Sequence, residues 1–429
     1  MSGYEGSAVN MKGEIGMAIN LKIGSGSFSE YAALIKEDRK GGAILLIMPF
    51  YTNYPALFKH LDSLTKQTFT GFDVVIVANA VSDEKRINDF IAKGKFPFGI
   101  AVVKRKEDTG SAGGYFTGEK YALEKGYQAV IIGDDDCLPM DDRLIEKMVA
   151  QWKGGFLAAG PECRFLMEDK VVYTNRALPF YNLIDISLLK KGGLHYLPAY
   201  IGADDIDFTL RVGKGVKISQ VDSYVTHPAR HSIFANFERS LLYRINQMLL
   251  TVPECFVDYM YDFAIICPIY LIFGSARAKA GAAHILESVL AHRYGKEALP
   301  KDAEYHENAP EKYDITVSPL KKGQGGYDYS EVRGGFGKLP GFSSMVRGKI
   351  VLLDMINNYA VLASMMLAKE TWIASSKGTY LIAKNPGIVQ DIAKICLFVL
   401  VLPFFLIGGV LTYLLNCLRK PDTRRYGLQ

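Results

Sequence analysis

The sequence predicts an α/β fold with a mostly parallel sheet and helices on both of its faces. Short apolar runs of strand length alternate with segments of helical periodicity from residue 43 onward, which is typical of repeated strand–helix units. An acidic run follows directly after one of the apolar strands, at the edge where open α/β sheets bind ligands. The chain has 429 residues, more than one core of usual size accommodates, so we expect two domains or one enlarged domain.

Four apolar runs are predicted to be buried strands of this sheet. Each is short and is bounded by turn residues or by a helical segment. The four runs are residues 43–48, 72–77, 99–103 and 129–132. The last one continues directly into Gly133 and three aspartates.

The segments between these strands carry apolar residues at helical spacing. Ser82 or Asp83 is suited to cap the second helix, and Pro139 precedes the fourth. The predicted helices are residues 55–66, the segment after 83, residues 112–125 and residues 140–152. Further on we expect short strands at 156–159 and 171–173, a helix at 205–212, and a linker or irregular extension at 280–345.

Composition excludes several classes of protein. Apolar residues make up 49% and charged residues 22% of the chain, which excludes a disordered or fibrous protein. Fifty Lys and Arg against 45 Asp and Glu give a net charge of +5, too small a surplus to indicate a nucleic-acid-binding protein. The six cysteines are scattered without metal-finger spacing. We therefore expect the protein to lie in a reducing environment, on the cytoplasmic side.

The C-terminal part contains a candidate membrane segment. Residues 395–418 carry no charge over 24 residues, long enough to cross a hydrocarbon core of about 30 Å. Pro403 and the pair Gly408-Gly409 are suited to kink this helix or to split it into a re-entrant hairpin. A basic cluster suited to anionic headgroups follows it: Arg419, Lys420, Arg424 and Arg425.

The topology of this segment is not fixed by the sequence. A single straight crossing from a cytoplasmic domain would put the basic tail outside, against the positive-inside trend, whereas a hairpin keeps both ends on one side. A second crossing through 256–276 is opposed by Asp258 and Asp262, because charges are costly at membrane depth. We expect 256–276 to be an interfacial or packed helix.

The first acidic cluster is the run Asp134-Asp135-Asp136. In a strand, residues two apart face the same side, so Asp134 and Asp136 are expected to face one site and Asp135 the other. Two converging carboxylates repel unless a cation joins them, and hard Mg²⁺ or Mn²⁺ suits oxygen ligands. The alternative is an acidic helix start, since Asp141 and Asp142 follow closely.

The second acidic cluster lies at the predicted start of a helix and contains Asp204, Asp205 and Asp207. A helix start stabilises negative charge, so we expect an ionised carboxylate there, suited to act as a general base. Asp207 is expected to stabilise the helix start or to bind substrate.

Two further features are expected to complete the site. His227 adds a nitrogen to the oxygen-rich metal site, with His231 as the alternative ligand, and Arg230 between them is suited to neutralise phosphate. The glycine-rich run 108–114 lies between a strand and a helix, where backbone amides can approach a phosphate or sugar. On its own such a run is often only a tight turn.

Taken in order, these motifs resemble the family-2 glycosyltransferases. The stretch Leu61 to Thr68 is similar to the family's "SLxxQT" helix, and Val77 to Asp83 to its "VDNGSxD" loop. Gly133 to Asp136 resembles its DxD motif, and Asp204 to Arg211 its "EDxDLxxR" motif. The glycine run and the spacing to His227 are more similar to the galactofuranosyl- and rhamnosyltransferase branch. The resemblance covers roughly residues 43–250.

The resemblance implies a GT-A-type fold and an inverting, metal-dependent transfer from a nucleotide-diphospho-sugar. It implies that Asp205 is the base and that Asp134, Asp136 and His227 hold Mn²⁺ or Mg²⁺. The residues expected to contact substrate are Pro49, Tyr51, Asn79, Asp83, Gly110, Gly113, Gly114, Asp135, Asp204, Asp207 and Arg230.

The membrane segment beside such a domain suggests a lipid-linked acceptor, such as a polyprenyl-diphosphate sugar, in the synthesis of a cell-surface polysaccharide or glycoconjugate. We expect a membrane-associated enzyme whose catalytic domain faces the cytoplasm, and a homo-oligomer is left open. The expected divisions are an N-terminal extension 1–42, a transferase domain 43–255, a helical or irregular extension 256–390, a membrane helix or re-entrant hairpin 391–420 and a basic tail 421–429.

Two other functions remain open. A metal-dependent nucleotidyltransferase or phosphohydrolase also needs carboxylates and a cation, but it gives no reason for an acceptor base at Asp205. A non-catalytic membrane scaffold with a degenerate transferase domain is favoured by Ala78, which stands where the family usually has an acidic residue, and opposed by the complete acidic set.

Overall fold

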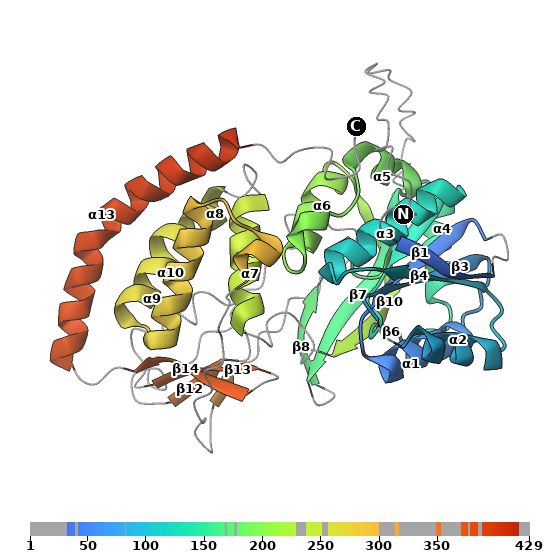
Figure 1. The fold of residues 1–429 in the computed structure, drawn as a ribbon, viewed down its shortest axis with the longest axis horizontal. Helices are drawn as coiled ribbons and strands as arrows, with labels where there is room; N and C mark the ends of the chain where they lie inside the picture. The colour runs from blue at the N-terminus through green and yellow to red at the C-terminus, as the bar shows by residue number, and fades with distance from the viewer. Residues whose placement is uncertain are drawn as a thin grey trace, which may run out of the picture.

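The computed structural model describes most of the chain from residue 32 to residue 419. The described ranges are 32–38, 42–81, 83–167, 170–175, 178–228, 237–250, 256–299, 314–316, 349–352, 370–375, 378–384 and 388–419. Within them, an α/β domain stands beside a layer of helices, and a small second sheet lies next to that layer (Figure 1).

The α/β domain is built on a ten-stranded mixed sheet with the order β1-β4-β3-β2-β5-β9-β7-β10-β6, in which β8 pairs with β7. Its centre is parallel, as predicted: β2 pairs with β3 and β5, and β3 pairs with β4. The strands are β1 (Ala32–Asp38), β2 (Ile44–Phe50), β3 (Phe72–Asn79), β4 (Gly99–Arg105), β5 (Ala129–Ile132), β6 (Leu138–Pro139), β7 (Ala158–Met167), β8 (Lys170–Asn175), β9 (Asn182–Asp185) and β10 (Ile218–Pro228).

Helices cover both faces of this sheet because successive strand residues point to opposite sides. Ile44, Leu46 and Met48 of β2 pack into one core together with α1, α2 and α4. Leu45 and Ile47 pack into the other core with α3, α5 and α6. The helices are α1 (Tyr54–Leu64), α2 (Glu84–Lys93), α3 (Gly110–Lys125), α4 (Leu144–Lys153), α5 (Ile186–Gly192), η2 (Leu197–Ala199) and α6 (Asp204–Val212).

Helix α3 lies unusually close to β2, and glycine makes this approach possible. A Cβ atom at Gly118 would come within 2.2 Å of Ile47 Cγ2, and one at Gly114 within 2.6 Å of Pro49 Cβ. Both distances are shorter than van der Waals contact allows. The glycines of this segment therefore seat α3 against the central strand.

The helical layer has an apolar core of its own. The layer consists of α7 (Phe237–Leu250), α8 (Phe256–Tyr261), the π-helical turn η5 (Asp262–Ile266), α9 (Cys267–Phe273), α10 (Ala276–Leu290), η6 (Gly295–Ala298) and α13 (Ile388–Leu418). Arg244 of α7 forms a buried ion pair with Asp262. The expectation of a packed helix at 256–276 agrees with this arrangement, since Asp262 faces a partner inside the protein.

Three features of the fold differ from the expectations. Residues 32–38 form β1, which pairs antiparallel with β4 at the sheet edge, so the N-terminal extension contributes a strand to the sheet. The expected linker from 280 begins inside α10, whose apolar residues pack against α7 and α9. The sequence analysis also did not predict the second sheet, of order β11-β12-β13-β14. Its strands are Asp314–Thr316, Lys349–Leu352, Glu370–Ser375 and Gly378–Lys384.

Helix α13 is continuous through Pro403, so the structure does not contain the re-entrant hairpin that was one of the two expectations. Pro403 does not interrupt the helix, and Gly408 and Gly409 lie against Phe263 of the layer below. Two helical stretches are long and apolar enough to span a membrane: Phe256–Phe273, 56% buried, and Ile392–Leu418, 11% buried.

Candidate active site

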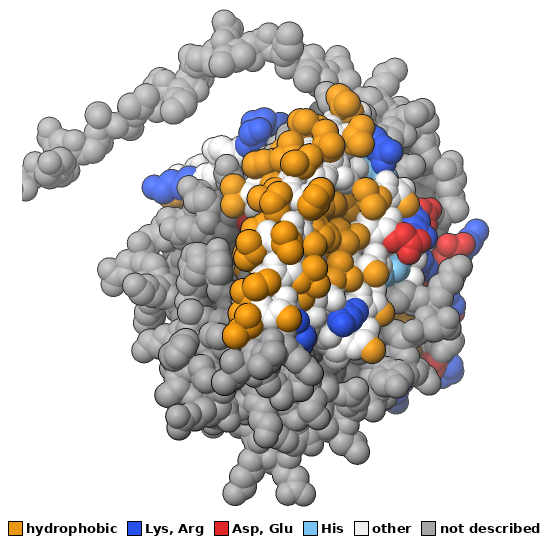
Figure 2. Space-filling model, turned by 90° about the vertical axis from the view of Figure 1, so that its left-hand side faces the viewer, with side chains coloured by type: hydrophobic (Ala, Val, Ile, Leu, Met, Phe, Trp, Pro, Cys, Tyr) orange, Lys and Arg blue, Asp and Glu red, His pale blue; other side chains and the backbone are white. Residues whose placement is uncertain are grey.

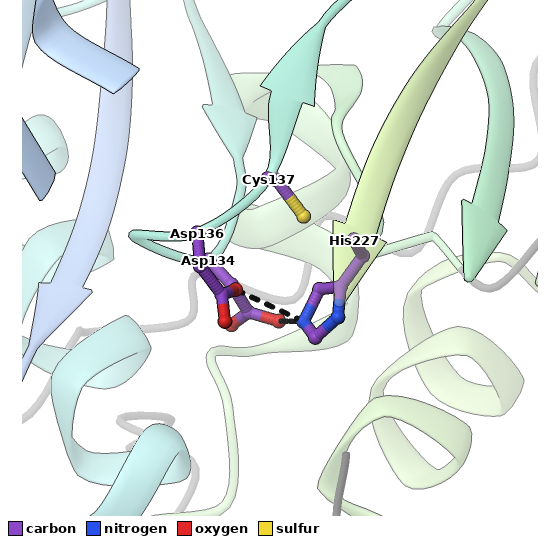
Figure 3. Close-up of side chains that lie close together, drawn as sticks. All are labelled: Asp134, Asp136, Cys137 and His227. Atoms are coloured by element: carbon purple, nitrogen blue, oxygen red, sulfur yellow. Dashed lines mark hydrogen bonds and ion pairs between the residues drawn. The ribbon is translucent and has the colours of Figure 1, made fainter. Parts of the chain in front are cut away.

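Asp134, Asp136 and His227 converge on one point at the carboxyl edge of the sheet (Figure 3). His227 Nε2 lies 3.2 Å from Asp134 Oδ2 and 3.1 Å from Asp136 Oδ1. Two elements far apart in sequence supply them: the turn after β5 and the end of β10. The possible ligand atoms of these three residues and of Cys137 all lie within 4.8 Å of one another.

Asp134 and Asp136 lie in a tight turn. The sequence analysis had assumed that they lie on an extended strand. The backbone N–H of Cys137 donates to the carbonyl of Asp134 at 3.2 Å and closes the turn. The turn brings both carboxylates to one side, where the ring of His227 meets them. The expected convergence is therefore reached through a different backbone geometry.

This group has the composition of a cation site. Two carboxylates and an imidazole suit a divalent cation such as Mn²⁺. Asp136 and His227 are 7% and 6% exposed, and the neighbouring carboxylates of Asp134 and Asp136 repel each other unless a positive charge offsets them. Cys137 is a poor ligand here, because its contact with Cys163 and its burial raise the pKa of its thiol well above the usual value.

The close contacts in this group shift the pKa values of its members. Burial works against the charged imidazole, yet the carboxylates of Asp136 and Asp134 raise the pKa of His227 well above its usual value. Burial raises the pKa of Asp134, but the hydrogen bonds from His227 and Tyr115 outweigh it, and the net pKa is lowered. Burial and the charges of its two neighbours raise the pKa of Asp135 well above the usual range. Asp135 therefore carries a proton more readily than Asp134.

Helix α3 connects this group to the second acidic cluster. The hydroxyl of Tyr115 donates to Asp134 Oδ1. Four residues earlier, Ser111 Oγ donates to Asp204 Oδ2 at 3.1 Å. Residues four apart are neighbours on one helix face, so the first two turns of α3 place the candidate cation group and the start of α6 beside each other.

Asp205 is half-buried in the first turn of α6. Burial, followed by the charge of Asp204, raises the pKa of Asp205 to about 7. The helix-start amides lower it only in part. The expectation of a fully ionised carboxylate at this helix start is therefore wrong, because burial beside a second carboxylate outweighs the helix dipole.

The other two aspartates of this cluster have internal partners. Asp204 Oδ1 accepts the backbone N–H of Gly202 at 2.8 Å. Asp207 Oδ2 accepts from Arg211 Nε at 3.0 Å and from a second Arg211 nitrogen at 2.8 Å. Arg211 also donates to the carbonyl of Leu194. Asp204 and Asp207 thus fix the start of α6 and leave Asp205 as the carboxylate available to a substrate.

The glycine-rich run is closed by protein groups. The amide of Asn79 donates to Asp108 Oδ1 and to the carbonyl of Gly110, both at 3.0 Å, and its oxygen accepts the N–H of Thr109 at 3.1 Å. Gly110 has a positive φ of 66°, and a Cβ atom at Gly113 would lie 1.9 Å from Thr109 Oγ1. Asn79, Gly110 and Gly113 therefore shape the loop that begins α3.

The remaining predicted residues occupy different settings. Tyr51, at the end of β2, is 53% exposed, whereas Pro49 packs under Gly114. Asp83 caps α2, since its Oδ1 accepts the backbone N–H of Arg86 at 3.2 Å. Arg230 and His231 lie outside the described residues.

Sequence reasoning missed several groups around the site. His195 and Glu119 form a fully buried pair 2.7 Å apart, and the His195 ring stacks on Phe208 of α6. His60 contacts Tyr181 at 2.8 Å beneath the aspartate turn. Their partners are separated by 76 and 121 positions, so no local spacing could have revealed them.

One side chain of α7, Asn246, also bears on the candidate site. Its amide donates to the carbonyls of Ala199, Ile201 and Gly202 at 2.9, 3.3 and 2.8 Å. Its oxygen accepts the N–H of Gly295 at 2.9 Å. This side chain holds the loop that leads into α6.

Comparison with known proteins adds a family match. Residues 45–200 match the model of Glycosyl transferase family 2. No curated protein matches the chain. Among solved structures, the mannosyltransferase PcManGT from Pyrobaculum calidifontis, in complex with GDP-Man and Mn²⁺, is 17% identical over 60% of this chain and 79% of its own, with a TM-score of 0.39. TarS from S. aureus, in complex with UDP-GlcNAc, is 14% identical over 60% of this chain and 81% of its own, also with a TM-score of 0.39.

Proposed function

From the premise that residues 45–200 of this chain belong to glycosyl transferase family 2, we propose that the protein is an inverting, metal-dependent glycosyltransferase. The donor is a nucleotide-diphospho-sugar and the acceptor a lipid-linked glycan of a cell-surface polysaccharide or glycoconjugate. The observation that carries the proposal is the pairing of two groups across α3: a cluster suited to a cation, and a half-buried carboxylate with a pKa near neutrality.

Asp134, Asp136 and His227 are the residues that would hold Mn²⁺ or Mg²⁺. A cation there supplies charge neutralisation for the diphosphate leaving group. Tyr115, through its hydrogen bond to Asp134 Oδ1, keeps that carboxylate turned toward His227. The exposed ring of Tyr51 at the end of β2 is available to the nucleotide.

Asp205 acts on the acceptor. The acceptor oxygen forms a bond to the anomeric carbon while the bond from that carbon to the diphosphate oxygen breaks. The hydroxyl proton passes to Asp205, and the nucleoside diphosphate leaves from the opposite face of the sugar, which inverts the anomeric centre. A base with a pKa near the working pH is efficient in this role.

The lipid-linked acceptor and the membrane location are supported by α13, which carries an uncharged stretch of 24 residues. In the proposed arrangement, the catalytic domain faces the cytoplasm. The free cysteines among the described residues agree with that side of the membrane.

The test is release of nucleoside diphosphate from a panel of nucleotide-diphospho-sugars by the detergent-solubilised protein, with membrane lipid extract as acceptor and with Mn²⁺ or EDTA. We expect one donor to be turned over, EDTA to abolish release, and Asp136→Ala to lose it. Asp142→Ala is the matched control, because Asp142 is an exposed aspartate six positions away and should leave release unchanged.

Other products would point to the other candidates. Nucleoside monophosphate or pyrophosphate would identify a nucleotidyltransferase or phosphohydrolase. Donor binding without turnover in the presence of acceptor would identify a scaffold.

A further inference from the structure

Helix α13 has an apolar outer face that runs its full length. Large apolar side chains recur at intervals of three and four residues and are between 53% and 80% exposed, which is one stripe of a helix. They form what we call the outer stripe: Leu400, Phe404, Ile407, Leu411, Leu414 and Leu418. Figure 2 shows hydrophobic side chains gathered in a patch on this side of the molecule.

Two polar side chains in the C-terminal half of α13 face the protein. Thr412 and Asn416 are 7% and 4% exposed. Asn416 contacts His292 Nδ1 at 3.1 Å and the hydroxyl of Tyr259 at 3.3 Å. A helix on a water-exposed surface has the reverse pattern, with polar groups outside and apolar groups inside. The outer stripe is therefore matched to an apolar medium.

The inner face of α13 packs along the whole of 256–273, in antiparallel direction. Lys394 lies over Phe273, with its nitrogen 5.8 Å from the ring centroid, and Phe405 meets Phe263 at 6.3 Å between centroids. At the other end, Tyr413 meets Phe256 at 4.8 Å. Whatever orientation α13 takes toward a membrane, α8 and α9 must share it.

This pairing bears on whether α13 crosses the membrane. Helix α10 packs against α9 on the side away from α13, and its Lys279 and Glu287 are exposed. If α13 stood across the bilayer, α9 and α10 would stand beside it, and these charges would face hydrocarbon, which is strongly unfavourable. If α13 lies in the plane of the bilayer, only the outer stripe meets lipid.

Cations stand at both ends of the stripe. Lys394 precedes it and Arg419 follows it, where an Arg419 nitrogen contacts the carbonyl of Leu290. In the sequence Lys420, Arg424 and Arg425 come next. Such flanks complement the phosphates of anionic lipids. A second copy of this chain would gain nothing from cations meeting cations.

We propose that the outer stripe is a monotopic docking face for an anionic phospholipid bilayer, with α13 lying in the plane of one leaflet. The helix is about 40 Å long over residues 392–418, at roughly 1.5 Å per residue. In the plane of the bilayer, this whole length is in contact with lipid. Both of its ends stay on one side, which removes the conflict with the positive-inside trend. The inference rests on the proposed membrane association and not on which sugar is transferred.

The test uses the full-length protein added to sealed vesicles of phosphatidylcholine with phosphatidylglycerol, or of phosphatidylcholine alone. We expect flotation with the anionic vesicles and weaker flotation with the neutral ones. The triple variant Leu400→Glu, Ile407→Glu, Leu414→Glu should lower the bound fraction at least tenfold, with an unchanged unfolding temperature in detergent. The matched control is Leu157→Glu, an exposed apolar residue of the α/β domain, 44% exposed, which should bind like the wild type.

Orientation is read with two cysteine variants, Ala393→Cys and Arg419→Cys, placed at exposed positions at the two ends of α13. A membrane-impermeant maleimide, followed by peptide mass spectrometry, should label both on intact vesicles. In parallel, single tryptophans at 400, 407 and 414 should be quenched equally by lipids brominated at one depth.

Each contrary result has a separate meaning. Labelling at one end only, or a gradient of quenching along the stripe, would show a crossing helix and overturn the in-plane arrangement. Failure of the wild type to float would overturn membrane association, while nucleotide release in detergent would still stand as a test of the transferase. A lipid-free dimer that the triple glutamate variant dissociates, without vesicle binding, would assign the stripe to a second copy.

Discussion

Asp205 owes its chemistry to its neighbours more than to its own place in the chain. The helix start would favour its ionised form, but burial and the adjacent Asp204 carboxylate oppose it. The balance leaves a carboxylate that changes protonation near neutral pH. A group of this kind can take a proton in one step of a cycle and release it before the next.

Activity should therefore depend on pH through Asp205. Because the ionised form is the base, kcat/KM is expected to rise as the pH rises through about 7 and to level off above it. Asp205→Asn should lower kcat by a factor on the order of 10²–10⁴ with donor affinity retained. Steady-state kinetics over a pH series and calorimetric titration of the donor measure both quantities.

Two variants frame this prediction. Asp204→Asn removes the neighbouring charge and should shift the midpoint of the profile to lower pH. Asp62→Asn, an exposed aspartate of α1, should change nothing. A midpoint that stayed fixed in Asp204→Asn would mean that another group controls the profile.

The residues themselves were largely foreseeable from sequence, but their environments were not. Asp134, Asp136 and His227 were predicted to share one site, and the structure places His227 Nε2 within 3.2 Å of both carboxylates. Tyr115 and Ser111 were not recognised, because a tyrosine and a serine in a helix carry no signal until the opposing carboxylates are in place. The shift at Asp205 was mispredicted because burial depends on the whole tertiary fold.

At the scale of the element, α3 is the part on which the site depends. Its first two turns contact both acidic clusters, and its glycines set its distance from β2. The sequence analysis located this helix to within two residues at its start. It did not predict the close approach of Gly114 and Gly118 to Pro49 and Ile47 of β2.

Gly118→Ala should destabilise the protein despite the better helix propensity of alanine. The new methyl would meet Ile47 Cγ2 at 2.2 Å, and overpacking of this kind costs about 1–3 kcal/mol, against roughly 1 kcal/mol gained in propensity. Chemical denaturation measures the net loss. Glu124→Ala on the exposed side of the same helix is the control, and equal stability of the two variants would contradict the close packing.

Helix α7 contributes through one side chain. The loop held by Asn246 contains Tyr200 and Ala203, whose φ angles of 65° and 57° are unfavourable for residues other than glycine. Such backbone persists only where surrounding contacts hold it. Asn246 supplies these contacts to the segment that ends at Asp204.

Asn246→Ala should therefore lower kcat at least tenfold while leaving the KM for the donor nearly unchanged, because the loop positions the acceptor base and not the cation group. Ser288→Ala is a suitable control, since Ser288 is a fully buried polar residue of the same helical layer, distant in sequence from the loop. If Asn246→Ala lowered stability as much as Ser288→Ala does but left kcat unchanged, Asn246 would contribute only to packing.

At the scale of the whole molecule, the α/β domain and the helical C-terminal part were predictable, whereas the second sheet and the packing between distant segments were not. Alternating strands and helices leave a clear periodic signal in residues 43–153, and repeated units of this kind permit few topologies. The second sheet and the pairing of α13 with 256–273 depend on contacts between distant segments. Hydropathy identified α13 as apolar, but it could not tell which of its sides the protein covers.

Removal of residues 388–429 should expose the apolar surface of the helical layer, including Met260 and Phe263 beneath Gly409. We expect aggregation in buffer, a lower unfolding temperature and recovery of solubility in detergent, measured by light scattering and calorimetry. In detergent, donor turnover with a soluble acceptor should remain, since no described residue of α13 belongs to the candidate active site. Complete loss of turnover in a folded truncated protein would show that α13 has a direct catalytic part.

The double engagement of Asn246 has one more consequence. Its amide nitrogen donates to carbonyls of the loop before α6, and its oxygen accepts the backbone N–H of Gly295 in the helical layer. The loop before α6 and the helical layer are therefore joined through one buried side chain. A change in the packing of that layer would reach the start of α6 without any contact between α13 and the candidate active site.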